Sequence, residues 1–373
     1  MALFAEKTKV FERQGKRVIH LEIGEPDFDT PLVIRRAAIN SLRLGDTHYG
    51  NALGLTALRS AIAKNTQERH GFLPDLNQII VAPGLSLVYF TLRCLTNPGD
   101  EVIAPDPGFT PYYSLFNFLG LRPVAVPLKE SEGFELDPRK LEERISQKTK
   151  IIIINSPQNP TGAVISKSKI QAIAKIAQRY DIPLLSDEVY SQILYGGRYY
   201  SPGSLDGCRR GTIILDSFSK AYAMTGWRLG YLIAPEELIK RIGLLIENTI
   251  YSVPDFIQKA GVEALRRGRT AQKTMVREYR KRRDVLVSGL NQLPGIRCLL
   301  PQGAFYAFPN VSGTGFKSEA FVNFMLERAQ VALLPGNLFG REGEGYVRAA
   351  FTVSVTDIKE GLRRMHQALM RHG

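Results

Sequence analysis

Between about residues 45 and 235, short apolar runs alternate with longer stretches in which apolar residues recur every three to four positions. This alternation predicts strands and amphipathic helices that build a mostly parallel sheet covered by helices on both faces. Several runs, including four isoleucines at 151–154, are continuously apolar, as strands buried on both faces should be. The predicted strands are residues 78–82, 101–104, 123–126, 150–155, 182–186, 212–215 and 230–234, with helices over 54–70, 85–94 and 168–180.

The segments on either side of this region follow a different pattern. Residues 1–40 predict a helix, an extended piece over 18–23 and a second helix, and a long basic helix begins after about residue 270. Short strands at 296–299, 304–309, 332–334 and 346–350 then precede a terminal helix. We therefore expect an α/β fold with a large domain over 45–275. A smaller α+β domain would contain 276–373 and be joined by the N-terminal segment 1–44.

Composition and charge narrow the class of protein without identifying it. The 373 residues are 44% hydrophobic and 23% charged, which is ordinary for a globular protein. The net charge is +13, and the densest basic cluster is residues 280–283. That cluster lies in a predicted helix whose solvated face accounts for it, so we expect no nucleic-acid partner.

The cysteines and the N-terminus bear on the compartment. Cys94, Cys208 and Cys298 are widely spaced and follow no metal-ligand pattern, which fits a reducing cytoplasm better than a disulfide framework. Charge begins at Glu6 without a long apolar stretch before it, and no apolar run is long enough to span a bilayer. We expect a cytoplasmic protein without a signal peptide, a membrane segment or a metal.

The most informative chemistry surrounds one lysine. Lys220 follows the strand predicted at 212–215, lies beside Ser217 and Ser219, and precedes Arg228 in a Gly-rich turn by eight residues. A lysine amine forms a Schiff base with an aldehyde, and hydroxyl and guanidinium groups bind a phosphate dianion. The segment is therefore arranged as a covalent anchor for an aldehyde cofactor with a phosphate clamp next to it.

Other polar groups follow other predicted strands. Gly84 comes after the first strand and opens a helix, Asn155 and Asn159 follow the four isoleucines, and Asp187 follows the strand at 182–186. In open α/β sheets the ligand lies outside the carboxyl ends of the strands. We expect these strand ends and Lys220 to converge on one site.

Several motifs, taken together and in this order, resemble those of a known family. They are Leu-Glu-Ile-Gly-Glu-Pro-Asp-Phe at 21–28, Asn-Pro-Thr-Gly at 159–162, Asp-Glu-Val-Tyr at 187–190, Ser-Phe-Ser-Lys at 217–220 and Gly-Trp-Arg-Leu-Gly at 226–230. The chain is similar to the fold-type I pyridoxal-phosphate aminotransferases of class I/II, the aspartate aminotransferase type. The resemblance covers the chain from about residue 21 to the final helix, and it implies the pyridoxal phosphate (PLP) transferase fold.

The resemblance also implies a role for each motif residue. Lys220 would hold PLP as a Schiff base and then move the substrate proton, Asp187 would face the pyridine nitrogen, and Tyr190 would bond the phenolic oxygen. The implied cofactor-binding residues are Leu85, Ser86, Phe109, Asn159, Asp187, Tyr190, Ser217, Ser219, Lys220, Arg228 and Tyr49. Tyr49 would reach the phosphate of a neighbouring subunit, which implies a homodimer with shared active sites.

The substrates implied are an L-amino acid and a 2-oxo acid. Arg348 and Asn159 would receive the α-carboxylate, and Gly24 would approach it by its backbone when the small domain closes. Many relatives that use dicarboxylates carry Gly-Lys after the position of Gly84, whereas this chain has Leu85 and Ser86. Ser86 cannot supply the positive charge of that lysine, which argues against strict specificity for aspartate or glutamate.

Three functions compete at this stage. The first is a ping-pong aminotransferase that moves the amino group of an L-amino acid to a 2-oxo acid. The second is a PLP-dependent β-C–S lyase on the same scaffold, which the same lysine and carboxylate clamp would support. The third is a non-catalytic regulator, a kind of protein that carries a DNA-binding module before the motif that begins here at Gly24.

Overall fold

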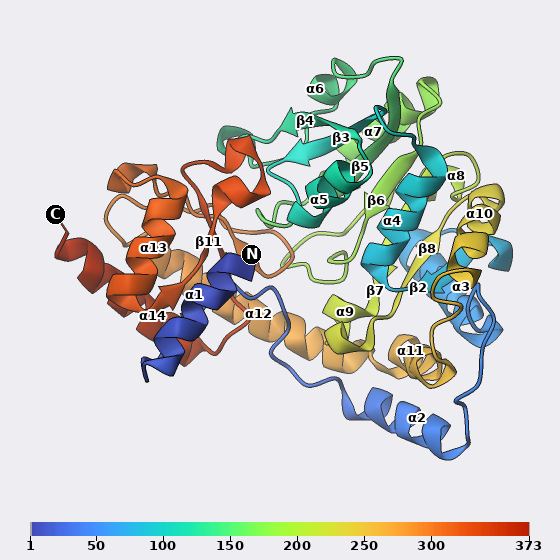
Figure 1. The fold of residues 1–373 in the computed structure, drawn as a ribbon, viewed down its shortest axis with the longest axis horizontal. Helices are drawn as coiled ribbons and strands as arrows, with labels where there is room; N and C mark the ends of the chain where they lie inside the picture. Colours follow the sequence, from blue (N-terminus) through green and yellow to red (C-terminus); the bar gives the residue numbers. More distant parts are fainter. Residues whose placement is uncertain (1, 373) are drawn as a thin grey trace.

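The computed structural model describes residues 2–372, with side chains from residue 6 onward. Its centre is a seven-stranded sheet in the order β2-β8-β7-β6-β5-β3-β4, in which only β8 runs antiparallel to its neighbours (Figure 1). This confirms the predicted mostly parallel sheet. The strands are β2 Ile79–Ala82, β3 Glu101–Asp106, β4 Arg122–Pro127, β5 Thr149–Asn155, β6 Leu184–Asp187, β7 Thr212–Ser217 and β8 Gly230–Ile233.

Helices cover both faces of this sheet because alternate strand residues point in opposite directions. In β5, Ile151 and Ile153 pack into a cluster with α4, α5 and α10, whereas Ile152 and Ile154 pack into a cluster with α6 and α7. All four isoleucines are fully buried, each contributing about 1.5–3 kcal/mol to folding. The covering helices are α3 Thr56–His70, α4 Gly84–Leu95, α5 Thr110–Phe118, α6 Pro138–Glu142, α7 Lys167–Arg179, α10 Glu236–Glu247 and α11 Asp255–Arg267, with short α8 Gly203–Asp206 and α9 Phe218–Ala221.

The remaining elements form a smaller unit beside the sheet, where the N-terminal helix lies next to the C-terminal elements (Figure 1). Strand β1 pairs in parallel with β10, and β11-β12-β9 form an antiparallel sheet. These elements are α1 Ala2–Arg13, β1 Ile19–His20, α12 Arg269–Leu290, β9 Tyr306–Ala307, α13 Ser318–Ala329, β10 Val331–Ala332, β11 Leu334–Pro335, β12 Val347–Ala350 and α14 Val355–Met370. The helix α2 Leu32–Arg43 packs against α11 of the larger unit, and α12 runs across the predicted boundary at 275/276.

One predicted strand, residues 296–299, is wrong. Only Arg297 makes a bridge, to Asn310. The backbone N–H and carbonyl of Cys298 instead bond to the side chain of Asn291, at 2.8 and 3.0 Å. That side chain takes the place of a neighbouring strand, and hydrophobic pattern alone does not reveal such local competition.

Among the described helices, none is both long and apolar enough to cross a membrane.

Candidate active site

The carboxyl ends of the parallel strands border a cavity of about 420 Å³. Its wall is built from the segments that follow β2, β3, β5, β6 and β7, together with the N-terminal segment around Gly24. The predicted convergence of strand ends is therefore confirmed. The predicted site residues that line the cavity are Gly24, Leu85, Phe109, Asn159, Asp187, Tyr190, Ser217, Ser219, Lys220 and Arg228.

Lys220 lies in α9, the short helix that begins directly after β7. The side chain of Ser217 caps this helix by accepting a hydrogen bond from the backbone N–H of Ser219 at 3.1 Å. The amine Nζ of Lys220 donates to the carbonyl oxygen of Gly24 at 2.7 Å. Burial, together with the nearby charge of Arg348, lowers the pKa of Lys220 to about 8. The strand end thus presents a lysine that is readily deprotonated.

A buried carboxylate faces the same cavity. Asp187 ends β6, where its Oδ1 accepts from the backbone N–H of Val189 at 3.2 Å and its Oδ2 accepts from the hydroxyl of Tyr112. Burial raises the pKa of Asp187 to about 7. A carboxylate at this depth is stabilised by a cationic or proton-sharing partner, such as a protonated ring nitrogen.

Hydroxyl groups and a guanidinium gather near the N-terminus of α4. Ser217 Oγ donates to the carbonyl of Leu229 at 3.1 Å and lies 3.0 Å from Ser219 Oγ. Arg228 is exposed, adopts a left-handed backbone with φ of 56°, and donates to the carbonyl of Thr225 at 2.8 Å. A left-handed conformation is uncommon for a residue other than glycine, and here it turns Arg228 into the cavity wall. These groups suit an anion such as phosphate.

Arg348, in β12, does not line the cavity but bonds to Asn159, which does. Its Nη1 donates to Asn159 Oδ1 at 3.1 Å, and its Nη2 donates to the carbonyl of Glu22 at 2.6 Å. The guanidinium is buried over the ring of Tyr306, whose hydroxyl lies 2.8 Å from that of Tyr190. Its Nε is buried without a hydrogen-bond partner among the described residues. Burial lowers the pKa of Arg348 because it destabilises the charged guanidinium. A bound anion would stabilise that charge and accept a hydrogen bond from this Nε.

Two further predicted residues also lie outside the cavity wall. Ser86 is partly buried in the first turn of α4, one residue beyond Leu85. Tyr49 is 83% exposed and packs on Tyr251, with 4.4 Å between the ring centres. The contacts of Ser86 and Tyr49 with the cofactor therefore stay predictions.

Sequence reasoning missed three contributors. Tyr112 bonds Asp187, Tyr306 joins Tyr190 to Arg348, and the carbonyl of Glu22 bonds Arg348. Tyr112 stands on α5 two residues after Thr110, where its spacing from Phe109 could have suggested a role next to the cavity. Nothing in the sequence around Tyr306 indicates its role, and Glu22, although part of the motif at 21–28, contributes through its backbone carbonyl, which no motif residue type reveals.

Comparison with known proteins identifies the family. Residues 16–365 match the model of the family described as "Aminotransferase class I and II". The chain is 42% identical over 366 residues to an aspartate aminotransferase of Pyrococcus horikoshii, covering 97% of this chain and 93% of that protein. It is 39% identical over 373 residues to aromatic-amino-acid aminotransferase 2 of Thermococcus litoralis, covering 98% and 95% of the two chains.

A solved structure agrees with this assignment. The aspartate aminotransferase of Rhizobium meliloti superposes with a TM-score of 0.95 at 34% identity, covering 99% of this chain and 96% of that chain. The chain therefore belongs to the class I and II aminotransferases, enzymes that use PLP to transfer an amino group between an amino acid and a 2-oxo acid. The comparisons do not favour the lyase alternative, and these relatives are named as enzymes rather than regulators.

The cavity fits PLP in size and in the groups that line it. A volume of about 420 Å³ lies within the range of cofactor pockets. Its wall offers an amine at Lys220, a buried carboxylate at Asp187, and hydroxyl and guanidinium groups at Ser217 and Arg228. A Cβ placed on Gly84 would meet only Ser217 Cβ, at 3.9 Å, so the backbone at the start of α4 is open to a ligand.

The lowered pKa of Lys220 predicts how cofactor loading depends on pH. Attack on an aldehyde requires the neutral amine, and a pKa lowered from 10.5 to about 8 makes half of that amine neutral near pH 8. We expect covalent uptake of PLP by cofactor-free enzyme to accelerate from about pH 6 and to level off above about pH 9. Stopped-flow absorbance at saturating cofactor measures this rate. A rate that keeps rising beyond pH 10 would show that the pKa of Lys220 is not lowered.

Proposed function

We propose that Lys220, Asp187 and the group around Ser217 hold PLP in the cavity at the strand ends. The observation that carries this proposal is that an amine and an anion-binding cluster at the end of β7 and a buried carboxylate at the end of β6 border one cavity. Lys220 would hold the aldehyde carbon and Asp187 the ring nitrogen. The hydroxyls of Ser217 and Ser219, the guanidinium of Arg228 and the first turn of α4, with Leu85 and Ser86, would hold the phosphate.

The protein side chains would then move one proton. PLP supplies an electron sink when bound. Lys220 Nζ, with its pKa of about 8, would take the proton from the substrate Cα and return it to the cofactor side. Asp187 would keep the ring nitrogen protonated, and Tyr112 would orient that carboxylate by its hydrogen bond. Phe109 would pack on the ring from its place in the cavity wall, and Tyr190 would bond the phenolic oxygen.

The α-carboxylate of the amino acid would bind where Arg348 and Asn159 meet. Arg348 already donates to Asn159, and its Nε has no partner among the described residues. The N-terminal segment would complete this subsite, since the carbonyls of Glu22 and Gly24 accept from Arg348 and Lys220. Substrate entry would displace or adjust these carbonyl contacts, because they occupy the donors that the substrate needs.

We propose that the preferred amino donor has an uncharged, apolar or aromatic side chain. The apolar part of the cavity wall includes Ile23, Leu85 and Val88, and the cations in the described lining are Lys220 and Arg228, both assigned above to the cofactor. The acidic residue Glu25 lies in the same wall, where its negative charge would repel the side-chain carboxylate of aspartate or glutamate. The names of the relatives include both aspartate and aromatic aminotransferases, so the donor proposal rests on the lining and not on those names.

This preference predicts a ratio of rates. We expect kcat/KM for phenylalanine to exceed that for aspartate by about tenfold or more, because the distal carboxylate would stay unpaired. Single half-reactions, followed by the bleaching of the cofactor absorbance, measure it for each amino acid. Leu85→Lys should raise the relative rate with aspartate, and Leu85→Met serves as the matched control. A wild-type preference for aspartate contradicts the donor proposal, whereas no bleaching by any amino acid contradicts the assignment of the cavity as the reaction site.

We also propose a homodimer in which Tyr49 reaches the phosphate in the partner's site. Tyr49 is 83% exposed and lies against Tyr251, which borders a groove together with Leu244, itself 62% exposed. Exposed apolar and aromatic groups of this kind favour association. The residue 45–275 unit would carry the cofactor and Asn159, and the 1–44 and 276–373 segments would supply the rest of the carboxylate subsite. The proposed compartment is the cytoplasm.

Sedimentation velocity over a range of protein concentrations tests the dimer. We expect a dimer at micromolar concentration, and we expect Tyr49→Phe to weaken PLP binding by about tenfold, the effect of one charge-assisted hydrogen bond. Tyr180→Phe, on the exposed end of α7, is the matched control. A monomer with full cofactor affinity would rule out the shared site.

A further inference from the structure

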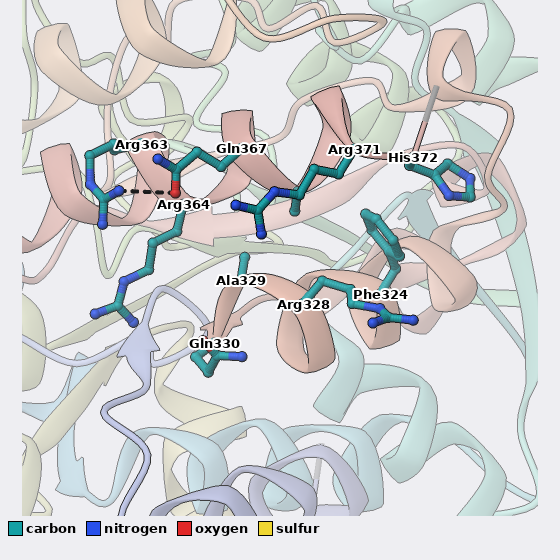
Figure 2. Close-up of a pocket in the computed structure, with 10 residues that line it drawn as sticks. Phe324, Arg328, Ala329, Gln330, Arg363, Arg364, Gln367, Arg371 and His372 are labelled. Atoms are coloured by element: carbon teal, nitrogen blue, oxygen red, sulfur yellow. Dashed lines mark hydrogen bonds between the residues drawn. The ribbon is translucent and has the colours of Figure 1, made fainter.

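A second cavity, of about 470 Å³, lies between the C-terminal parts of α13 and α14 and shares no lining residue with the active-site cavity (Figure 2). Arg328 comes from the last turn of α13, and Arg363, Arg364 and Arg371 come from α14 and the residue that follows it. Positions 364 and 371 are seven apart, or two helical turns, so they share one face of α14. Figure 2 shows Arg364 and Arg371 extending from α14 and Arg328 extending from α13.

The charges in this cavity are not balanced. Four arginines line it, and none of its described lining residues is an aspartate or glutamate. Glu360, just outside the lining, accepts from Arg363 at 2.8 Å and from Arg364 at 2.7 Å. Arg328 and Arg371 make no hydrogen bond or ion pair with a described residue. Four guanidinium charges minus one carboxylate leave three positive charges around one hollow.

Helix ends account for only part of this charge. Arginines stabilise the C-terminus of a helix because each helix end carries about half a negative charge, so two ends account for about one unit. About two positive charges then remain uncompensated. Part of the cluster is also fixed in place, since Arg364 donates to the carbonyl of Arg17 at 2.8 Å and Arg363 donates to Gln367 at 3.0 Å (Figure 2). Arg363 and Arg364 are therefore held in position before any ligand arrives.

We propose that this cavity is a binding site for a small multivalent phosphate, either an inorganic polyphosphate or the phosphate tail of a nucleotide. Planar guanidinium forks bind phosphate oxygens in pairs, and several forks around one hollow suit an anion with more than one phosphate. The volume suits a small molecule. At one end the ring of Phe324 lies 4.9 Å from that of His372, an aromatic surface that a nucleotide base could contact.

Calorimetric titration of the PLP-loaded full chain tests this site, because bound cofactor keeps added phosphate out of the active site. Pyrophosphate, tripolyphosphate, ATP and citrate are titrated separately at the same ionic strength. We expect saturable binding of one phosphate ligand per chain below about 1 mM, tighter than citrate by about fivefold or more. Tighter binding of ATP than of tripolyphosphate would assign the nucleotide as the source, and the reverse would assign the inorganic anion.

Variants separate the site from general attraction to a basic protein. Arg328→Gln and Arg371→Gln should each weaken binding by about tenfold, since each removes one charge-assisted contact. Arg277→Gln, an exposed arginine of α12 outside this cavity, removes the same charge and should leave the affinity unchanged. Equal affinity of wild type and the Arg371 variant, equal binding of citrate, or no saturable heat with any phosphate would overturn the proposal. Both substitutions are at exposed positions, so folding is preserved.

Discussion

Lys220→Ala is expected to lower kcat by about 10³-fold or more while the chain stays folded. Lys220 supplies the only amine among the described residues that line the active-site cavity, and its amine lies where the ends of β6 and β7 meet. Without it, PLP would have no covalent partner, and no group of suitable pKa would remain there to move the proton from the substrate Cα. Initial-rate kinetics with a saturating amino donor measure the loss.

The loss should be chemical rather than structural. The hydrogen bond from Lys220 to the carbonyl of Gly24 contributes about 1 kcal/mol to stability, so the melting temperature should change by only about 2 °C. The variant should still bind PLP through the groups around Ser217, without the absorbance of a covalent adduct. Lys273→Ala, an exposed lysine of α12, should keep full activity. Activity of the Lys220 variant within tenfold of wild type would show that another group does this work.

The sheet could be predicted because its strands carry their burial in their sequence. Ile151 to Ile154 form a short β-branched run, which is typical of a strand buried on both faces, and polar residues directly after such strands are expected at one edge of the sheet. The place of Asp187 follows from that rule. Its partner Tyr112 does not, because it lies 75 residues away and reaches the carboxylate from α5, by packing that no local pattern encodes.

The smaller unit was harder to predict for a related reason. Its strands are two to four residues long, so hydrophobic alternation has little length in which to appear. At residues 296–299 the side chain of Asn291 satisfies the backbone of Cys298, and no strand forms. For Arg348 the family motif points to a carboxylate subsite. The contact that holds its Nη2, the backbone carbonyl of Glu22, depends on how the N-terminal segment folds back over β12.

Arg348→Ala is expected to lower kcat/KM for amino acids by about 10²-fold, with a smaller effect on kcat. Arg348 is 4% exposed, and its hydrogen bonds to described residues go to an amide oxygen and a backbone carbonyl, not to a carboxylate. Its Nη1 and Nη2 bond to Asn159 and to the carbonyl of Glu22, while Nε has no partner. The α-carboxylate of the substrate would pair with this buried cation. Removing such a contact costs about 3 kcal/mol, which lowers kcat/KM by about 10²-fold.

The geometry of the guanidinium makes a second variant informative. Arg348→Lys keeps the charge but cannot bond Asn159 and the substrate through one planar fork, so its kcat/KM should fall between those of wild type and the alanine variant. The affinity for PLP should fall far less than kcat/KM in both variants, because Arg348 does not line the cofactor cavity and acts on Lys220 only through its charge. Initial rates with a series of amino donors, together with equilibrium PLP titration, measure both quantities. If kcat/KM is unchanged in Arg348→Ala, the carboxylate binds elsewhere, and Arg348 serves only to join β12 to Asn159 and the N-terminal segment.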